Sequence, residues 1–403
     1  MTRGGENKLA RRLGLGLFVF YGVGVMVGAG IYVLIGEVAA RVGPWAPMAF
    51  LLAGATAAFT AASFAELSCR LPESAGEAAY VREAFGRLWL ATVVGLAVAA
   101  VGVISAGAVL QGGVGYLMAL LPLPKFVLIV GVGLLLGIVS ALGVEKALGF
   151  AAIITAIEVL GLLIVSFVAT TSELPAPVQP EFDALPVVAL SGAAFLAFFA
   201  FLGFEDMVNM AEEVKSPLRN LPRGSFIALA VTVIIYVLVA WAVTRIVSAA
   251  ELGASDRPLA LVFERATGGG SWSIEAIAVM AAVNGVIAQI VMASRVIYGL
   301  GRRVAFLAYF KSTNPVTRTP VRATAVITAF VILLALGAPV ATLAAISAFI
   351  LLVIFAAMNL ALLRLKQLGP APENGFVAPV WAPWAGFVSA LAMCLAELLR
   401  LAA

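Results

Sequence analysis

The sequence predicts an all-α polytopic membrane protein made of two five-span halves of opposite orientation, each beginning with a broken helix. Three observations support this fold class. The 403 residues are 63% hydrophobic and only 11% charged, with a mean hydropathy of +1.11, whereas a soluble domain is about 25% charged. Apolar runs long enough to cross a bilayer recur along the chain. The first and the sixth of these runs contain residues that interrupt a helix.

We expect about 11 transmembrane helices in a single transmembrane domain over residues 1–403. The first repeat covers about 15–170, the second about 186–363, and an extra C-terminal helix covers about 383–401. The expected spans are Leu15–Ala40, Ala46–Ser68, Leu88–Leu121, Phe126–Leu142, Ala147–Thr170, Pro186–Ala211, Gly224–Ser248, Ser273–Leu300, Val321–Leu336, Val340–Leu363 and Pro383–Leu401.

The first span contains four glycines, Gly22, Gly24, Gly28 and Gly30. Each glycine inside a helix costs roughly 1 kcal/mol relative to alanine. Broken backbone inside a membrane is tolerated only where protein or a water-filled cavity receives the freed polar groups. We therefore expect two half-helices that meet between Gly28 and Gly30, where the N–H groups of the second half offer a site for a carboxylate. The alternative is that these glycines only allow neighbouring helices to pack closely.

The sixth span contains Gly203 followed by the adjacent acids Glu205 and Asp206 in an otherwise apolar segment. Acids inside a span are costly and usually functional, although a position at a cytoplasmic helix end would explain Asp206. Five spans separate the starts of the two broken helices. Because five is odd, the second copy begins on the opposite side of the membrane, and the repeat is inverted. Inverted repeats with broken helices are typical of secondary transporters, whose site lies between the breaks.

The basic residues give the orientation and narrow the function. Nineteen of the 25 lysines and arginines fall on the side that holds the N-terminus, so the positive-inside rule places that terminus in the cytoplasm. Eleven spans put the C-terminus outside, and twelve would put it inside. There is no histidine, and Cys69 and Cys394 are far apart, so we expect no metal site, disulfide or cofactor. The net charge of +4 belongs to a membrane face and does not indicate nucleic acid.

Short motifs surround the two breaks and the connections after them. They are Gly28-Ala-Gly-Ile-Tyr32, Ser63-Phe-Ala-Glu66-Leu, Arg70-Leu-Pro-Glu-Ser-Ala-Gly-Glu77, Phe198-Phe-Ala-Phe-Leu-Gly-Phe-Glu205, Glu212-Glu-Val-Lys-Ser-Pro217, Arg219-Asn-Leu-Pro222, and Met292-Ala-Ser-Arg295 with Tyr298. Together they are highly specific and cover the first ten spans. The chain resembles the amino acid–polyamine–organocation (APC) superfamily, with the leucine-transporter fold. Most relatives have twelve spans, so the usual dimer contacts of the last two helices are in doubt and the oligomeric state stays open.

The resemblance implies an amino acid substrate and no enzymatic reaction. Its carboxylate would meet backbone N–H groups where the second half-helix starts, and its ammonium would meet carbonyl groups at both breaks. Phe201 would be an aromatic lid over the substrate, unless it only packs in the core. The implied substrate-binding residues are Met26, Gly28, Ala29, Gly30, Phe199, Phe201 and Leu202.

Five further polar residues lie inside spans: Ser105, Gln111, Asn284, Gln289 and Ser347. They could line a pocket for the substrate side chain. Polar side chains in membrane bundles also hydrogen-bond between helices, and we favour that interpretation.

Glu158 is the first candidate for ion or proton coupling, and Glu205 is the second. When the fifth span is aligned on Gly143-Val144 and Phe150, Glu158 falls where the resemblance places a lysine in proton-coupled relatives. A carboxyl group there can hold a proton, bind Na⁺ or attract a substrate ammonium. We favour the proton, place sodium second, and keep a purely structural hydrogen bond as the alternative.

The sequence therefore predicts an amino acid permease of the cytoplasmic membrane, working by alternating access as a symporter or antiporter. An amino acid or polyamine exchanger without ion coupling is the main alternative. A channel would need a continuous polar stripe, which no span shows, and a ligand sensor usually carries a soluble output domain. A membrane enzyme would have to rely on carboxylates alone. The pattern leaves open which amino acid is carried.

Overall fold

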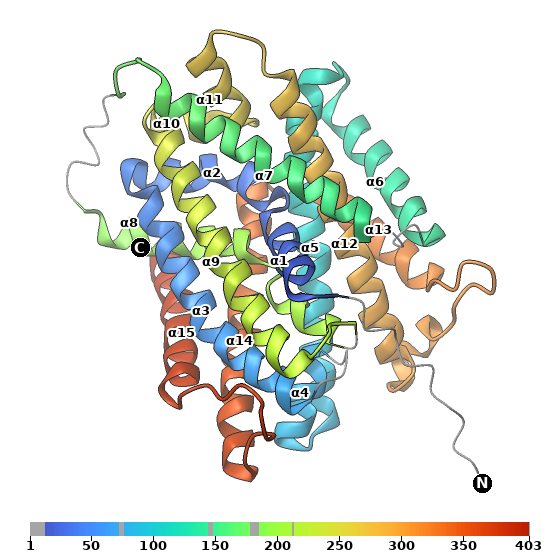
Figure 1. The fold of residues 1–403 in the computed structure, drawn as a ribbon. Helices are drawn as coiled ribbons and strands as arrows, with labels where there is room; N and C mark the ends of the chain where they lie inside the picture. Colours follow the sequence, from blue (N-terminus) through green and yellow to red (C-terminus); the bar gives the residue numbers. More distant parts are fainter. Residues whose placement is uncertain (1–12, 72–75, 144–147, 178–184, 212, 403) are drawn as a thin grey trace.

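The computed structural model describes residues 13–71, 76–143, 148–177, 185–211 and 213–402. Several parts of the motifs named above lie outside these residues, namely 72–75, Val144 with its neighbours, and Glu212. The basic residues of segment 1–12 lie outside them as well. The described chain is all helical, and its helices run mostly along the long axis of the molecule (Figure 1).

The expected fold class is confirmed, and every expected span is a helix or a pair of half-helices. Within the described residues, nine helical segments are long and apolar enough to cross a membrane, and two shorter apolar helices, Leu15–Val27 and Val321–Gly337, add to them. The spans are α1 (Leu15–Val27) with α2 (Ala29–Val42), α3 (Ala46–Arg70), α5 (Leu88–Leu120), α6 (Lys125–Leu142), α7 (Leu148–Thr171), α8 (Val187–Ala197) with η3 (Phe198–Phe201) and η4 (Glu205–Met210), α9 (Pro217–Thr244), α12 (Trp272–Gly301), α13 (Val321–Gly337), α14 (Val340–Leu368) and α15 (Trp381–Ala402).

Helix α9 begins at Pro217, earlier than the expected start at Gly224. Proline at the first helical position costs nothing, because that N–H has no partner in any helix. Pro222 then lies inside the helix, where it cannot donate to the carbonyl of Leu218 four residues earlier. The Sγ of Cys69 donates to that carbonyl over 3.5 Å instead, so a neighbouring helix compensates for the proline.

Short helices occupy the same connection in each expected half of the chain. Helix α4 (Gly76–Phe85) follows the second span of the first half, and α10 (Ala249–Ala254) with α11 (Pro258–Thr267) follows the second span of the second half. Figure 1 places α4 at one end of the molecule and α10 with α11 at the other. The two connections thus have matching places in the chain and opposite sides in space. The sequence does not predict these helices, because each is too short to show a clear period.

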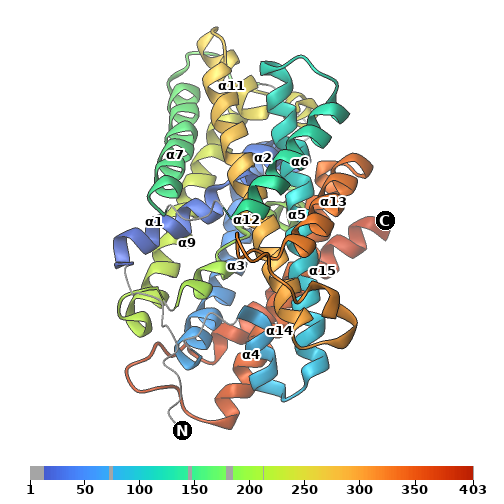
Figure 2. The same ribbon diagram turned by 90° about the vertical axis from the view of Figure 1, so that its right-hand side faces the viewer.

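Most spans belong to one of two packed groups, and both broken helices are in the first group. One group contains α1, α2, α3, α8 and α9, and the other contains α5, α6, α12 and α13 (Figure 2). Helix α5 runs along α12, and Gly113 allows the close approach, since a Cβ atom there would lie 2.3 Å from the Cβ of Ala282. Helix α7 packs on α1 and α9, and α15 packs on α3, α8 and α14.

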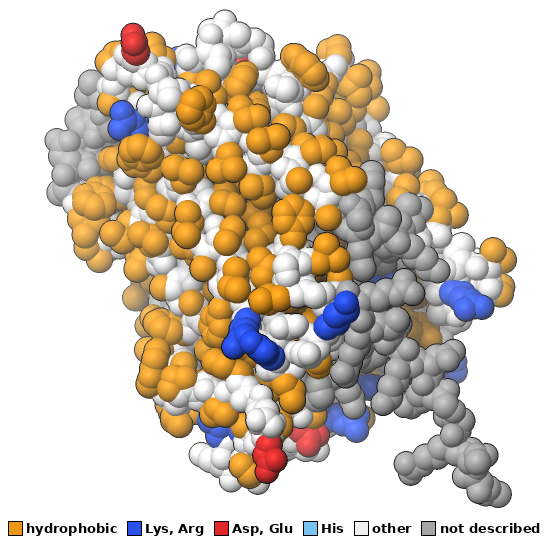
Figure 3. Space-filling view, in the orientation of Figure 1, with side chains coloured by type: hydrophobic (Ala, Val, Ile, Leu, Met, Phe, Trp, Pro, Cys, Tyr) orange, Lys and Arg blue, Asp and Glu red, His pale blue; other side chains and the backbone are white. Residues whose placement is uncertain are grey.

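The surface has the polarity that a bilayer requires. Figure 3 shows a broad belt of hydrophobic side chains across the middle of one face, with charged side chains mostly in its lower part and at its upper edge. Large apolar side chains within the spans are exposed, such as Phe167 of α7 and Leu333 of α13, at 68% and 62%. Exposure of this kind is favourable in lipid, and it confirms a multi-pass membrane protein.

One buried acid joins three segments at the end of the molecule that holds α4. Glu66, at the last turn of α3, is fully buried, and its carboxylate pairs with Arg70 at 2.8 Å and with Lys366 of α14 at 2.5 Å. It also accepts the backbone N–H of Ala378 at 2.8 Å. Arg70 in turn donates to the carbonyl of Gly369 at 3.1 Å. The connection from α14 to α15 is therefore fastened to α3 by a fully partnered buried charge.

Replacing Glu66→Gln should destabilise the fold, because two cations lose their buried counter-charge. Removing one partner of a buried ion pair costs about 3 kcal/mol or more. We expect a clearly lower midpoint of thermal unfolding in detergent than for Glu373→Gln, which changes the same group at an exposed position of the same connection. Equal midpoints for the two variants would contradict a structural role for Glu66.

Candidate functional site

The first broken span separates at a single residue. Gly28 has φ −40° and ψ −163°, which ends α1 at Val27 and lets α2 begin at Ala29. The N–H groups of Ala29 and Gly30 are the first of α2 and have no partner one turn earlier in a continuous helix. The expected break is thus present, and it places these N–H groups and the positive end of the α2 dipole inside the bundle.

The second broken span unwinds over a longer stretch. Helix α8 tightens into the 3₁₀ turn η3, turns at Leu202 and Gly203, and resumes as η4. Gly203 has φ +114°, a conformation that other residues rarely adopt. Its N–H donates to Oε2 of Glu205 over 2.9 Å, and Glu205 is only 6% exposed. Glu205, expected as a coupling candidate, therefore satisfies a backbone donor of its own break.

The two breaks lie against each other. A Cβ atom at Gly30 would lie 3.1 Å from the Cα of Ala200, and one at Gly203 would lie 2.5 Å from Cγ1 of Val25. The other two glycines of the first span also serve close packing, because Gly24 faces Thr155 of α7 and Gly22 faces Met207. Both interpretations of the glycines thus have support: one glycine breaks the helix and the others admit its neighbours.

Tyr236 of α9 connects the two breaks, although it is not among the expected site residues. Its hydroxyl oxygen lies 2.6 Å from the carbonyl oxygen of Met26 and 2.8 Å from that of Ala200. The hydroxyl has one proton and donates to one carbonyl at a time. Its ring is fully buried against Phe50 and Phe201. A single tyrosine in the middle of an apolar span was the available signal.

The remaining residues of the expected substrate site surround this contact. The carbonyl of Phe199 accepts the N–H of Leu202 over 3.1 Å. Phe201 is fully buried, and its ring lies 5.1 Å from that of Tyr236 in an edge-on arrangement. It also faces Gly54 of α3. In this conformation Phe201 packs in the core beside the breaks.

Glu158 is buried and has an unsatisfied carboxyl group. It is fully buried on α7, and within the described residues neither side-chain oxygen has a hydrogen-bond partner. Asn284 of α12 faces the carboxyl group, but no hydrogen bond closes between them. One turn earlier, Thr155 contacts Gly24 of α1. The structure thus places Glu158 between α7 and α12, close to the half-helix that ends at the first break.

The other polar candidates divide into two sets. Ser105 bonds to Ser347 over 3.2 Å, and Gln111 donates to the carbonyl of Ala335 over 2.9 Å. These three residues link α5 to α14 and α13, as interhelical hydrogen bonds do. Asn284 and Gln289 lie on α12, and Oε1 of the half-buried Gln289 has no partner among the described residues. Oε1 of Gln111 also lacks a partner among the described residues. Gln289 faces Gly102 of α5, so of these five residues Asn284, opposite Glu158, is the one that faces the candidate coupling group.

A chain of hydrogen bonds runs from Glu158 to the opposite end of the molecule from α4. The Tyr32 hydroxyl donates to the main-chain carbonyl of Glu158 over 2.7 Å, and the Tyr116 hydroxyl donates to the carbonyl of Tyr32 over 2.8 Å. Tyr116 then accepts the N–H of Leu259, the second residue of α11. This chain ties the second half-helix to α7, α5 and α11.

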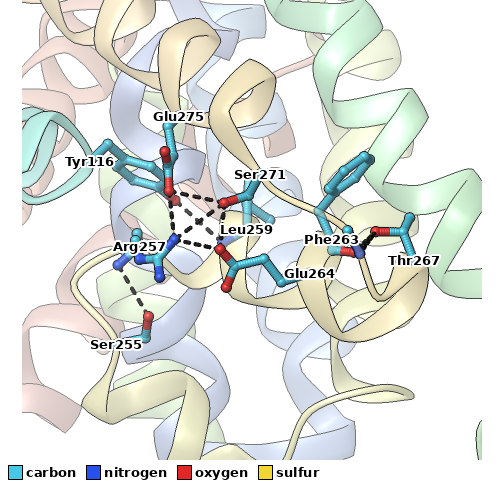
Figure 4. Close-up of polar contacts among 10 residues, drawn as sticks. Tyr116, Ser255, Arg257, Leu259, Phe263, Glu264, Thr267, Ser271 and Glu275 are labelled. Carbon is cyan, nitrogen blue, oxygen red and sulfur yellow. Dashed lines mark hydrogen bonds and ion pairs between the residues drawn. The ribbon is translucent and has the colours of Figure 1, made fainter. Parts of the chain in front are cut away.

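An ion-pair cluster fixes α11 beside that chain. Figure 4 shows Arg257, Glu264, Ser271 and Glu275 pointing toward one another, with Tyr116 behind them. Arg257 lies 2.8 Å from Glu264 and 2.5 Å from Glu275. The hydrogen bond that Arg257 donates to Glu264, together with the charge of that carboxylate, raises the pKa of Arg257, so this cation stays charged. The sequence does not indicate the cluster, because its members are spread over residues 257–275 and meet only in the folded chain.

A second titratable group lies at the other end. Glu77 of α4 is 6% exposed, and burial, with the charge of Asp206 as a smaller cause, raises the pKa of its carboxyl group to about 7. The pKa of an isolated glutamate is about 4.3. Glu77 therefore changes its charge near neutral pH, beside the end of the second broken span.

Comparison with known proteins agrees with this geometry. A family model described as amino acid permease matches residues 15–400. The chain is 28% identical to a branched-chain amino acid permease of Bacillus subtilis, over 93% of this chain and 85% of that protein. It is 30% identical to a vacuolar cationic amino acid transporter of Arabidopsis thaliana, over 91% of this chain and 65% of that protein. An uncharacterized transporter of Mycobacterium tuberculosis is 30% identical, over 89% of this chain and 81% of that protein.

Replacing Tyr236→Phe should weaken the junction between the breaks, because it removes the donor that reaches the carbonyls of Met26 and Ala200. Leaving a buried acceptor without a donor costs about 1–3 kcal/mol. We expect a lower unfolding midpoint and reduced uptake into proteoliposomes.

Tyr80→Phe is the matched control, since the Tyr80 hydroxyl is buried but has no hydrogen-bond partner among the described residues. That variant should keep both values near wild type. Equal behaviour of the two variants would show that the Tyr236 hydroxyl does not hold the breaks together.

Proposed function

The chain belongs to the amino acid permease family of the APC superfamily, and from this premise we propose that it moves amino acids across the cytoplasmic membrane by alternating access. Its family and its relatives make it a transporter of amino acids and not an enzyme. The observation that carries the proposal is the contact between the two breaks, where Gly30 at the start of α2 faces Ala200 of η3.

The geometry suggests how an amino acid would bind there. Its carboxylate would accept the N–H groups of Ala29 and Gly30, since an anion is favoured at a helix N-terminus. Its ammonium would approach the carbonyls of Phe199 and Leu202 on the unwound span. The carbonyl of Met26 would join them when the Tyr236 hydroxyl donates to Ala200 instead. Tyr236 thus offers a simple exchange of partners that substrate binding would use.

Glu158 is the group that we assign to coupling, and the proton is the ion that we propose. The support is its unpartnered carboxyl group, fully buried beside the first broken span. A buried carboxyl group without a counter-ion is far more stable when it carries a proton. An exchanger without ion coupling is the second candidate, because the same carboxylate would suit a cationic substrate such as those in the names of several relatives.

We also propose that the N-terminal side faces the cytoplasm. Among the described residues, the end of the molecule that holds α4 carries Arg70, Lys215, Arg219, Arg223 and Lys366, at the foot of α3, α9 and α14. Basic residues near the ends of spans gather on the cytoplasmic side.

Replacing Gly30→Leu should abolish transport while the protein still folds. The Cβ atom at position 30 would lie 3.1 Å from the Cα of Ala200. The rest of the leucine side chain would cover the N–H groups proposed for the carboxylate. Overpacking that costs about 1–3 kcal/mol would by itself weaken binding by about five- to 140-fold. The measurement is uptake of radiolabelled amino acids into proteoliposomes. Gly16→Leu is the control, since Gly16 lies in the same broken span with open space around it. Normal uptake by the Gly30 variant would exclude this site.

Replacing Glu158→Gln should remove the dependence of uptake on external pH, because an amide cannot carry the proton. Uptake is measured across a series of external pH values, with and without sodium. Glu173→Gln, an exposed glutamate beyond the end of α7, should keep the wild-type profile. If the Glu158 variant retains wild-type dependence on both ions, Glu158 is not the coupling group and its role is structural.

A further inference from the structure

A cavity lies at the foot of α9, away from the two breaks. It is an open cavity with a volume of about 780 Å³, lined by the first two turns of α9 and by residues 374–376 of the connection from α14 to α15. None of these residues belongs to the proposed amino acid site. The cavity lies at the end of the molecule that also holds Arg70 and Lys366.

Two arginines line this cavity, and no described acidic side chain pairs with either of them. Arg219 and Arg223 are four residues apart, so they share one face of α9. Both are exposed, and neither makes an ion pair or hydrogen bond through its side chain within the described part of the chain. Glu373 precedes the other wall but forms no ion pair with either arginine. Guanidinium groups bind phosphate oxygens in a geometry that matches them well.

The same face of α9 continues into the membrane as an apolar stripe. Ile227, Val231 and Ile234 follow Arg223 at helical spacing and are 44%, 36% and 66% exposed. These side chains lie on the surface of a span, where lipid covers them. The arginines therefore stand where the headgroup of a lipid would be if its acyl chain lay along this stripe.

The residues that line the cavity are held in place by contacts with neighbouring helices. The ring of Phe376 contacts that of Phe226 at 5.6 Å between centroids. The partner residues of Glu66 hold the same connection to α3. Cys69 reaches the carbonyl of Leu218, which also lines the cavity. A ligand would thus enter a formed cavity and would not have to order a free loop.

We propose that this cavity binds the phosphate-bearing headgroup of an anionic phospholipid, in the leaflet on the α4 side of the protein. The arginines supply the charge, residues 374–376 supply the enclosing wall, and the apolar stripe supplies the acyl-chain contact. Basic pockets at the membrane surface bind anionic headgroups in this way. The bound lipid would stabilise the folded protein by mass action. This inference is independent of the amino acid site.

The test uses full-length protein in detergent and compares three forms: wild type, Arg219→Gln with Arg223→Gln, and the control Arg302→Gln with Arg303→Gln. The control removes two neighbouring exposed arginines after α12, which do not line the cavity. Phosphatidylglycerol is titrated in mixed micelles, with phosphatidylcholine as the neutral lipid, and the unfolding midpoint and the bound lipid by native mass spectrometry are recorded. We expect phosphatidylglycerol to raise the wild-type midpoint and the cavity variant to bind it about thirtyfold more weakly. The control should resemble wild type.

Two further additions identify the source of the phosphate. Inorganic phosphate and water-soluble glycerophosphoglycerol carry the charge without acyl chains, and neither should reproduce the stabilisation at equal concentration. If either one does, the site takes a small anion and the lipid proposal is wrong. Equal loss of binding in both double variants would show attraction to the whole basic face, and no effect of phosphatidylglycerol on wild type would also overturn the proposal. Amino acid uptake by the cavity variant, measured in neutral lipid, should match that of wild type.

Discussion

The structure depends on the rule that a polar backbone group inside a bilayer must find a partner within the protein. The two breaks free such groups in the middle of the bundle. The carboxylate of Glu205 accepts the N–H of Gly203. The hydroxyl of Tyr236 donates to the carbonyl of Met26 or to that of Ala200. One polar side chain of the second broken span and one of α9 therefore partner the interrupted backbone. What stays unpaired, at the start of α2, is the part that a substrate can use.

The buried acids follow the same logic and separate into structural and functional groups. Glu66 has two cations and a backbone N–H around its carboxylate. Glu158 is as deeply buried and has no partner for either oxygen within the described residues. A fully partnered charge fastens segments together, whereas an unpartnered one is unfavourable unless it gains a proton or a ligand. Burial alone does not distinguish the two acids, but their partners do.

The sequence predicted the parts of the fold that have a long or unusual local pattern. Long apolar runs gave all the spans, and Gly28 and Gly203 gave both breaks, because helix interruption is encoded by the residue at the break itself. Tyr236 and the Arg257 cluster could not be predicted in the same way. Their roles come from contacts between residues far apart in the chain, such as Tyr236 with Met26. The start of α9 was misplaced because Pro222 suggests a boundary, while Cys69 makes the proline tolerable.

The first broken span has two halves that are held differently, and this bears on how alternating access would proceed. The second half, α2, is tied by hydrogen bonds through Tyr32 and Tyr116 to α7 and α5. The first half, α1, is the inner half in the proposed orientation, and it contacts α7 and α9 mainly through apolar and glycine positions. Its foot is joined instead to the segment after the second broken span, where Leu13 exchanges two backbone hydrogen bonds with Glu213 and Lys215. Gly28 therefore separates a half anchored to its surroundings from a half anchored to its partner span. In the proposed cycle the inner ends of both broken spans would move as one unit, with Gly28 and Gly203 as the places where the backbone bends.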